Sequence, residues 1–219
     1  MTFQKKDFVE IEFIGKVKDG TVFDSNIPAE VKKLKLPIKN PKPFVLVIGE
    51  GMFLKGVEEF LEGKPEPSEK ADEYDLELEP EKSFGKRQSS LVQVMPRKIF
   101  NQQKLNPVAG AILNFDGRIG KILSVSGGRI IVDFNNPMAG KTVIYKIFVK
   151  RKLTDVKEKA ESLIEFFTRK HLECEVKEKK LIVQADEQTL PFVMVFKEKI
   201  KELLKLEDVE VKTSKKKAE

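Results

Sequence analysis

The side chains of this chain that could do chemistry are mostly aromatic. The 219 residues include one histidine, His171, and one cysteine, Cys174, whereas metal centres and hydrolytic triads need several such groups. The sequence contains no Walker loop, nucleophile elbow, zinc-binding helix motif or dinucleotide fingerprint. We therefore expect no metal and no cofactor, and any activity must need little acid or base. What remains is a set of aromatic residues near the ends of predicted elements, namely Phe13, Phe23, Phe44, Phe53, Phe84 and Tyr145.

Composition alone favours a structural role for such residues. Phenylalanine accounts for 16 residues and tryptophan is absent, so phenylalanine must also do the ordinary packing of the core. Cys174 alternates with Leu172 and Val176, a pattern that predicts a buried strand position and not a nucleophile. The order and spacing of the aromatic residues must therefore decide their role.

The composition is that of a globular chain with room for more than one domain. Hydrophobic residues make up 40% and charged residues 35%, which excludes disordered and collagen-like classes. The sequence lacks an apolar run long enough to span a membrane and an apolar signal region near its start, so we expect a cytoplasmic protein without a membrane partner. Residues 58–82 hold eleven acids and three lysines, whereas 86–133 hold eight bases and two acids. This change of sign predicts a domain boundary near Gly85.

The N-terminal part of the chain predicts strands around one short helix. Alternating Val9, Ile11 and Phe13 precede an Asp19-Gly20 turn, a pattern typical of a hairpin. Residues 26–43 carry four prolines and no steady period, which predicts a long surface excursion. The further elements expected here are a strand at 44–48, a helix at 55–61 and a strand at 73–79.

The remaining residues predict a small β module followed by a mixed unit. The module has short strands at 91–95, 111–116, 121–126 and 129–134, with one helical turn at 97–100. A long strand follows at 143–149. The last unit begins with a helix capped by Thr154 or Asp155 and continues as a hairpin of 172–176 and 181–184, a helix at 190–204 and a strand at 209–212.

The order and spacing of these residues resemble the FKBP-type peptidyl-prolyl cis-trans isomerases. The resemblance rests on Asp19-Gly20, Phe23-Asp24-Ser25, Phe44 with Gly49, Lys55-Gly56-Val57-Glu58-Glu59, Phe84-Gly85 and the strand through Tyr145. The module at 86–136, with the segment up to Gly140, looks like the insert-in-flap domain of the SlyD-like subgroup. The whole chain is similar to a long-type archaeal FKBP with an extra C-terminal domain.

This resemblance implies an α+β fold and an enzyme. We expect an FKBP-like antiparallel sheet around a short helix, an inserted small β domain, and a C-terminal α-β-β-α-β domain. The activity implied is rotation about X-Pro bonds in unfolded or nascent polypeptides and proline-containing peptides. The expected ranges are an isomerase domain at 1–86 and 137–153, an insert at 87–136, a C-terminal domain at 154–212 and a disordered tail at 213–219.

Carried over one residue at a time, the resemblance also implies a proline pocket. Its catalytic residues would be Asp24, Tyr145, Phe84 and Phe23, and its substrate-binding residues would be Phe13, Phe44, Phe53, Leu54 and Val57. Asp24 could instead stabilise the turn after Phe23. Val57 stands where many family members have a tryptophan, which predicts a shallower pocket floor. The histidine-rich metal tail of bacterial SlyD is absent, so no metal delivery is expected.

The insert would bind unfolded chains through apolar side chains. The candidates are Met95, Ile99, Phe100, Val132, Phe134 and Met138, although packing in a small β core is the stronger expectation for most of them. An alternative function is a holding chaperone or peptide-binding module with little isomerase activity.

The sequence also bears on two further partners, nucleic acid and a second copy of the chain. The basic insert and the C-terminal lysines could suit nucleic acid, but the lysines are dispersed and no strand shows paired aromatic residues for stacking. We therefore expect no nucleic acid. The last unit carries more apolar side chains than a unit of its size easily buries, notably Phe192, Val195 and Phe196. This excess predicts either self-association, as a homodimer through the C-terminal domain, or contact with client chains.

Overall fold

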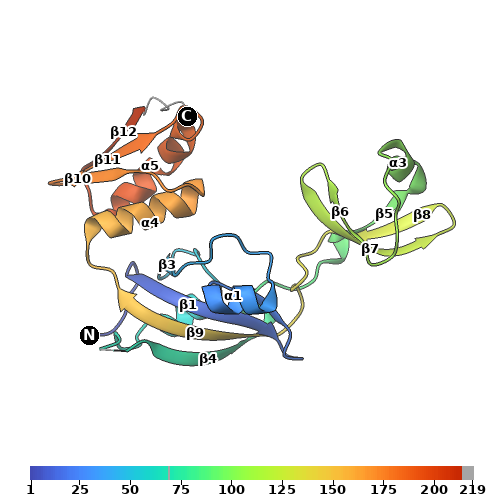
Figure 1. Ribbon diagram of the computed structural model, residues 1–219, viewed down its shortest axis with the longest axis horizontal. Helices are drawn as coiled ribbons and strands as arrows, with labels where there is room; N and C mark the ends of the chain where they lie inside the picture. Colours follow the sequence, from blue (N-terminus) through green and yellow to red (C-terminus); the bar gives the residue numbers. More distant parts are fainter. Residues whose placement is uncertain (69, 214–219) are drawn as a thin grey trace. The chain divides into compact units, whose positions relative to one another are not determined.

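Three sheets organise the protein in a computed structural model that describes residues 1–68 and 70–213 (Figure 1). Residue contacts divide the chain into two compact units. One consists of Met1–Gly15, Val22–Leu76 and Lys146–Glu219, and the other of Lys16–Thr21 and Glu77–Tyr145. No helix among the described residues is long and apolar enough to cross a membrane. The tail predicted at 213–219 lies, apart from Thr213 in the last strand, outside the described residues.

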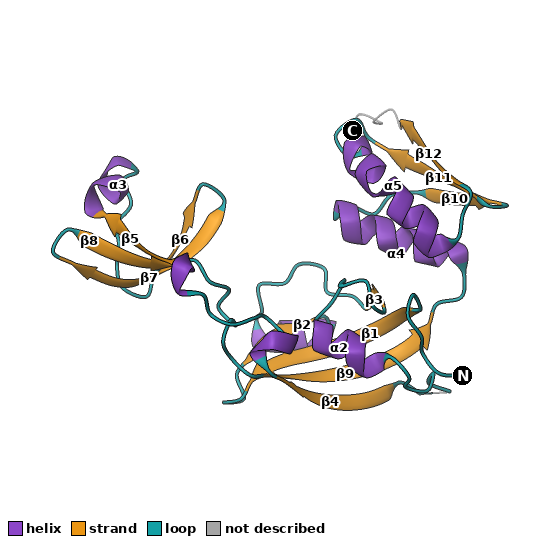
Figure 2. Cartoon of the chain, turned by 180° about the vertical axis from the view of Figure 1, so that it is seen from behind, coloured by secondary structure: helices purple, strands orange, loops and turns teal. Residues whose placement is uncertain are grey.

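A five-stranded sheet forms the FKBP-like part of the chain. Its strand order is β2-β1-β9-β4, with β3 paired to β1, and Figure 2 shows helix α2 lying across one face. Val9, Ile11, Leu46 and Val57 are fully buried in its core, and the predicted α+β fold is confirmed. The bounds are β1 (Phe8–Val17), β2 (Val22–Ser25), β3 (Phe44–Val47), α2 (Lys55–Leu61), β4 (Asp72–Leu78) and β9 (Val143–Lys152).

The expectation that residues 26–43 form only irregular structure is wrong. Helix α1 (Pro28–Leu34) occupies the middle of this segment. Pro28 stands in the first turn, where a helix needs no amide donor, and Val31 buries its side chain. Lys35 adopts the left-handed conformation and ends the helix. The prolines of this segment therefore do not exclude a helix, and Pro28 marks where the helix begins.

The C-terminal domain has the predicted α-β-β-α-β order. In its sheet β11 pairs antiparallel with β10 and parallel with β12. The Asp155 carboxylate accepts the backbone N–H of Glu158 at 2.8 Å and caps the first helix. Cys174 is buried as predicted, and this burial raises the pKa of its thiol to about 12. The elements are α4 (Val156–Thr168), β10 (Cys174–Lys177), β11 (Lys180–Ala185), α5 (Leu190–Leu204) and β12 (Asp208–Thr213).

The insert is a four-stranded sheet of order β5-β8-β7-β6 with one helix, α3. Its core contains Phe100, Phe115, Ile122, Ile130 and Val132. The inserted β domain expected from the sequence is therefore present. Its elements, with the two short 3-10 helices that precede it, are η1 (Pro80–Lys82), η2 (Ser89–Leu91), β5 (Val92–Pro96), α3 (Arg97–Gln102), β6 (Ile112–Phe115), β7 (Arg118–Ser126) and β8 (Arg129–Asp133).

Two of the six predicted client-binding residues are wrong as surface contacts. Phe100 and Val132 are fully buried in the core of the insert. Met95, Ile99 and Phe134 are half-buried and pack against the same core. The insert has about fifty residues, so most of its inward-facing apolar side chains are needed for its own stability.

Gly120 in β7 provides a test of this core. A Cβ atom there would lie 2.6 Å from Val132 Cγ1 and 2.9 Å from Phe134 Cε1, so Gly120→Ala overpacks the centre of the insert. We expect a loss of about 1–3 kcal/mol in the free energy of unfolding of the insert, measured by denaturant titration with amide hydrogen exchange. The control is Ile119→Ala at the exposed neighbouring position, which should cost much less. Equal stability of the two variants would contradict the packing described.

Candidate active site

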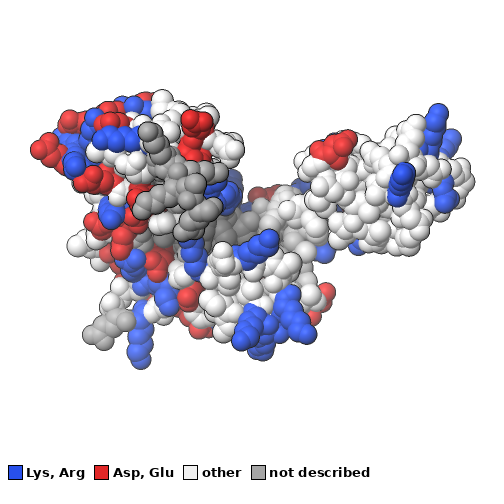
Figure 3. All heavy atoms as spheres, turned by 45° about the horizontal axis from the view of Figure 1, so that its top comes forward, with Lys and Arg blue, Asp and Glu red and all other residues white. Residues whose placement is uncertain are grey.

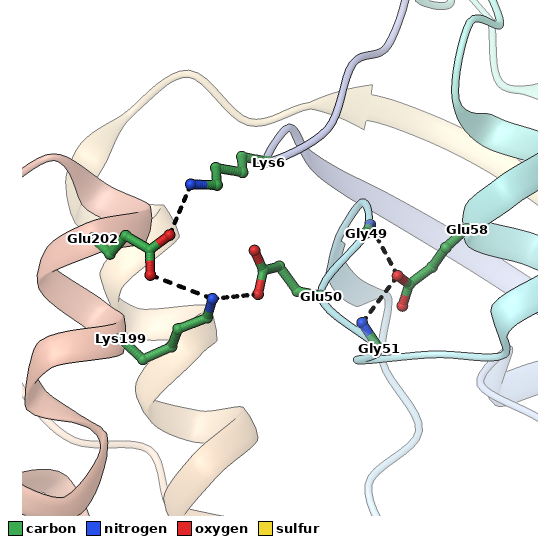
Figure 4. A network of polar contacts seen from close by, with 7 residues as sticks. All are labelled: Lys6, Gly49, Glu50, Gly51, Glu58, Lys199 and Glu202. Atoms are coloured by element: carbon green, nitrogen blue, oxygen red, sulfur yellow. Dashed lines mark hydrogen bonds and ion pairs between the residues drawn. The ribbon is translucent and has the colours of Figure 1, made fainter.

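The carboxylate of Glu58 shapes the loop that connects β3 to α2. Glu58 is only 5% exposed, and its carboxylate accepts the backbone N–H groups of Gly49 at 2.9 Å, Gly51 at 3.0 Å and Phe53 at 2.8 Å. Figure 4 shows the amides of Gly49 and Gly51 directed at this side chain. Both glycines have positive φ, +85° and +68°, a conformation that lets the backbone curl around the carboxylate. The position of Phe53 is fixed as a result.

Sequence reasoning did not select Glu58 as a site residue, although a signal was available. Glu58 follows Val57 and precedes Leu61 on the buried face of α2, so an acid occupies a position where the helix needs an apolar side chain. A buried carboxylate must find donors. The glycine-containing turn just before the helix is the nearest source of free amides.

Three of the predicted substrate-binding residues meet as a row of rings. The Phe13 ring on β1 lies 4.9 Å from the Phe53 ring, and the Phe53 ring lies 5.6 Å from the Phe44 ring on β3. All three line a groove of about 740 Å³. The other two members of the predicted set belong to α2, where Leu54 is the half-buried N-cap residue and Val57 is fully buried.

Asn26 holds the end of β2 against β1 beside this row. Its side-chain oxygen accepts the N–H of Phe13 at 2.7 Å, and its amide nitrogen donates to the carbonyl of Ile11 at 3.0 Å. The Ser25 hydroxyl donates to the carbonyl of Phe13 at 2.9 Å. These buried hydrogen bonds fix both the Phe13 backbone and the chain immediately after Asp24.

The four predicted catalytic residues come from three places in the chain. Phe23 and Asp24 are half-buried on β2. Phe84 is half-buried in the segment between η1 and η2, and Tyr145 is fully buried on β9. Their roles stay predictions.

The groove suits the binding of an apolar ring better than covalent chemistry. Its aromatic floor provides contact surface that excludes water. The raised pKa of Cys174 leaves that thiol almost entirely protonated at neutral pH. In the described part of the chain, no three histidine, cysteine, aspartate or glutamate side chains gather to hold a metal ion.

Comparisons with known proteins match both the N-terminal residues and the insert to FKBP families. Residues 1–107 match the family model described as FKBP-type peptidyl-prolyl cis-trans isomerase, and residues 93–138 match that of the FKBP26 IF domain. The short-type peptidyl-prolyl cis-trans isomerase of Methanocaldococcus jannaschii is 30% identical over 149 residues, which cover 67% of this chain and 92% of that protein.

Bacterial relatives give a similar result. The FKBP-type 16 kDa peptidyl-prolyl cis-trans isomerase of Escherichia coli is 30% identical over 151 residues, covering 67% of this chain and 91% of the relative. The isomerase SlyD of Aeromonas hydrophila is 26% identical over 144 residues, covering 65% of this chain and 60% of the relative. In each of these matches about a third of this chain has no aligned counterpart.

Replacing Glu58 tests whether its carboxylate holds the loop. In Glu58→Gln an amide NH₂ replaces one acceptor oxygen and opposes a backbone N–H, so we expect a loss of about 1–3 kcal/mol in the free energy of unfolding. Hydrogen exchange at the amides of Gly49, Gly51 and Phe53 should become faster. The matched control is Glu62→Gln, an exposed carboxylate one helical turn later, which should leave both quantities nearly unchanged. Unchanged exchange at the three amides in Glu58→Gln would refute the role.

Proposed function

This chain belongs to the FKBP-type peptidyl-prolyl cis-trans isomerases, and from that premise we propose that the groove at Phe13, Phe44 and Phe53 receives the proline of unfolded or partly folded protein clients. The family establishes the enzyme type. The observation that supports this site is the row of three rings, in which Phe53 stands on a loop fixed by a buried carboxylate. The aromatic part of the site is therefore formed before any substrate arrives.

The reaction suits a site without a nucleophile. Rotation about an X-Pro bond breaks no bond, and its barrier of about 18–20 kcal/mol comes from amide resonance. A dry aromatic pocket that holds the proline ring and removes water from the preceding carbonyl favours the twisted, less dipolar amide over the planar one. Because each factor of ten in rate needs about 1.4 kcal/mol, a few such contacts suffice.

The remaining predicted residues have distinct roles in this proposal. Phe23, Phe84, Leu54 and Val57 are not among the residues that line the groove. In this proposal Phe23 and Phe84 add aromatic surface for the substrate, and Leu54 and Val57 support the floor of the site from α2. The hydroxyl of Tyr145, on a fully buried side chain, requires a hydrogen-bond partner, and it holds substrate or Asp24. Asp24 orients that contact or meets the twisted amide electrostatically. Valine in place of the larger tryptophan makes the floor shallower, which weakens the binding of bulky inhibitors more than catalysis.

Two substitutions test the assignment of the catalytic residues. We expect Tyr145→Phe and Asp24→Ala each to lower kcat/KM for a proline-containing tetrapeptide by about tenfold, since each removes one polar contact in a dry site. The assay is protease-free isomerisation, with the melting temperature as a check on folding. Tyr74→Phe is the matched control because Tyr74 lies half-buried on β4 and its hydroxyl donates to Asp72 at 3.4 Å. Unchanged catalysis in both variants would remove the site assignment.

We further propose that the insert binds client chains through the outer face of its sheet. Ile112 and Ile119, 64% and 59% exposed, lie on this face of β6 and β7, and exposed Val94 pairs with Ile131 across β5 and β8. Leu123 of β7 is also exposed. The side of the insert seen in Figure 3 is mostly uncharged. Apolar side chains this exposed, although Lys121 and Asn114 are paired with two of them, mark an interaction surface for apolar segments.

The outer face gives a second test, which separates recruitment from catalysis. Ile112→Ser with Ile119→Ser should slow the catalysed refolding of a proline-limited protein by about tenfold and leave tetrapeptide isomerisation unchanged, because a client bound by the same chain has a higher effective concentration at the pocket. Leu34→Ser, an exposed apolar position on α1, is the control. Equal loss in both assays, or in neither, would contradict recruitment by this face.

The alternative function, a holding chaperone with little isomerase activity, predicts different results in these assays. It expects no acceleration of the tetrapeptide by the unmodified chain, while aggregation of an unfolded client is still suppressed. The predicted homodimer is supported by exposed Phe192, Met194 and Val195 on α5, and sedimentation of the full chain against one truncated at residue 153 would decide it. The cytoplasmic location and the lack of a nucleic-acid partner stay predictions.

A further inference from the structure

The C-terminal domain is attached to the loop that carries Phe53 by a chain of ion pairs. Lys199 of α5 lies 2.6 Å from Glu50 and 3.4 Å from Glu202, and Glu202 lies 2.7 Å from Lys6 (Figure 4). The hydrogen bond to Glu50 raises the pKa of Lys199, and the hydrogen bond from Lys6 lowers that of Glu202. Glu50 lies between the two glycines that bind Glu58.

Helix α4 of the same domain lines the groove that contains Phe13, Phe44 and Phe53. Its contribution consists of Glu158, Glu161, Ser162, Glu165 and Phe166, and the C-cap residue Arg169 also lines the groove. The Phe166 ring lies 6.2 Å from the Phe44 ring, so the row of rings continues from the FKBP sheet onto this helix. Because the row and the groove coincide, the helix forms a wall of the site and not a separate surface.

We propose that the C-terminal domain is part of the substrate site, and that Phe166 with the adjoining face of α4 binds a large apolar side chain of the client a few residues away from the proline. This inference rests on the proposed function of the groove. It gives the domain a role in substrate selection for the same reaction.

The length of the row sets the position of the selected residue. Two ring-to-ring steps of 5.6 and 6.2 Å connect Phe53 to Phe166 through Phe44. A fully extended chain advances about 3.3–3.6 Å per residue, so about three to four residues cover this span. A tetrapeptide with a central proline is too short to reach Phe166.

The charges in the groove favour an apolar residue over a charged one. Arg151 pairs with Glu10 at 3.0 Å and with Glu158 at 2.8 Å, and Lys42 pairs with Glu165. Two of the three acids of the α4 wall thus meet bases from the FKBP part of the chain, and the third, Glu161, pairs with Lys157 of α4 itself. Since a charged client residue would have to compete with these existing pairs, the aromatic ring is the stronger recognition element.

The test compares twelve-residue peptides that differ at one position. Each contains one Ala-Pro unit, with Phe or Ser placed four residues from the proline on its N-terminal or C-terminal side. For the full chain we expect about tenfold tighter Kd and higher kcat/KM for the Phe peptide in one of the two arrangements, a size consistent with partial burial of one phenylalanine. Phe166→Ala should abolish this preference, so that the Phe and Ser peptides become equal in Kd and in kcat/KM.

Two control variants distinguish direct contact from a change in folding. Phe166→Leu keeps an apolar side chain and should retain most of the preference, and Phe192→Ala alters an exposed phenylalanine on α5 outside the groove and should retain all of it. If the full chain shows no Phe preference, or if Phe166→Ala retains it, the inference is refuted. If no peptide is isomerised, the proposed function fails, and the Kd values still decide whether Phe166 selects an apolar residue.

Discussion

The site depends on the hydrogen bonds that the buried carboxylate of Glu58 accepts from the loop before α2. A charged group removed from water must be met by donors, and the amides of Gly49, Gly51 and Phe53 are those donors. One side chain of α2 thus determines the path of the loop, and the loop places the Phe53 ring against Phe13 and Phe44. Glu58 thus determines the local backbone shape and the aromatic row, and the C-terminal domain contacts the same loop through a separate ion pair with Glu50.

Catalysis of a bond rotation needs no nucleophile, metal or proton-transfer group. Residue types alone therefore could not reveal the site. The pocket needs shape, dryness and a few polar contacts, and these come from the same residue types that fill ordinary cores. Phe13 is both a buried strand residue and a wall of the groove. The order and spacing of the residues carried the identification, because packing requirements alone would accept many other arrangements.

The sequence predicted the bounds of helices and strands well where apolar residues recur regularly or where glycine or proline stands near an end of the element. Helices α2 and α5 begin and end at the predicted residues, since glycine or proline marks their ends and apolar residues recur at helical spacing. Helix α1 was missed because Pro28 reads as a breaker unless the next turn is known to bury Val31. Glu58 was missed because its donors are backbone amides, so the sequence signals them only indirectly, through an acid on the buried face of α2 that follows a glycine-containing turn.

The insert shows a different limit of prediction from sequence. Alternation along β8 places Ile130 and Val132 on one face and Ile131 on the other, so apolar residues stand on both faces. Which face becomes the core depends on where α3 packs, and Phe100 of that helix is found against Ile130 and Val132. The inference from sequence therefore selected residues of the covered face as client contacts, whereas the open face carries Val94, Ile112 and Ile119.

The contacts that attach the C-terminal domain are of a kind that suits a wall of a substrate site. Lys6, Lys199 and Glu202 remain between 40% and 51% exposed, and ion pairs at such positions contribute at most about 1 kcal/mol each. A large apolar interface would fix the wall permanently, whereas these pairs can exchange for water at small cost when a client chain enters the groove. The aromatic contact between Phe44 and Phe166 then becomes the one that a client side chain can join or replace, because it lies in the groove itself.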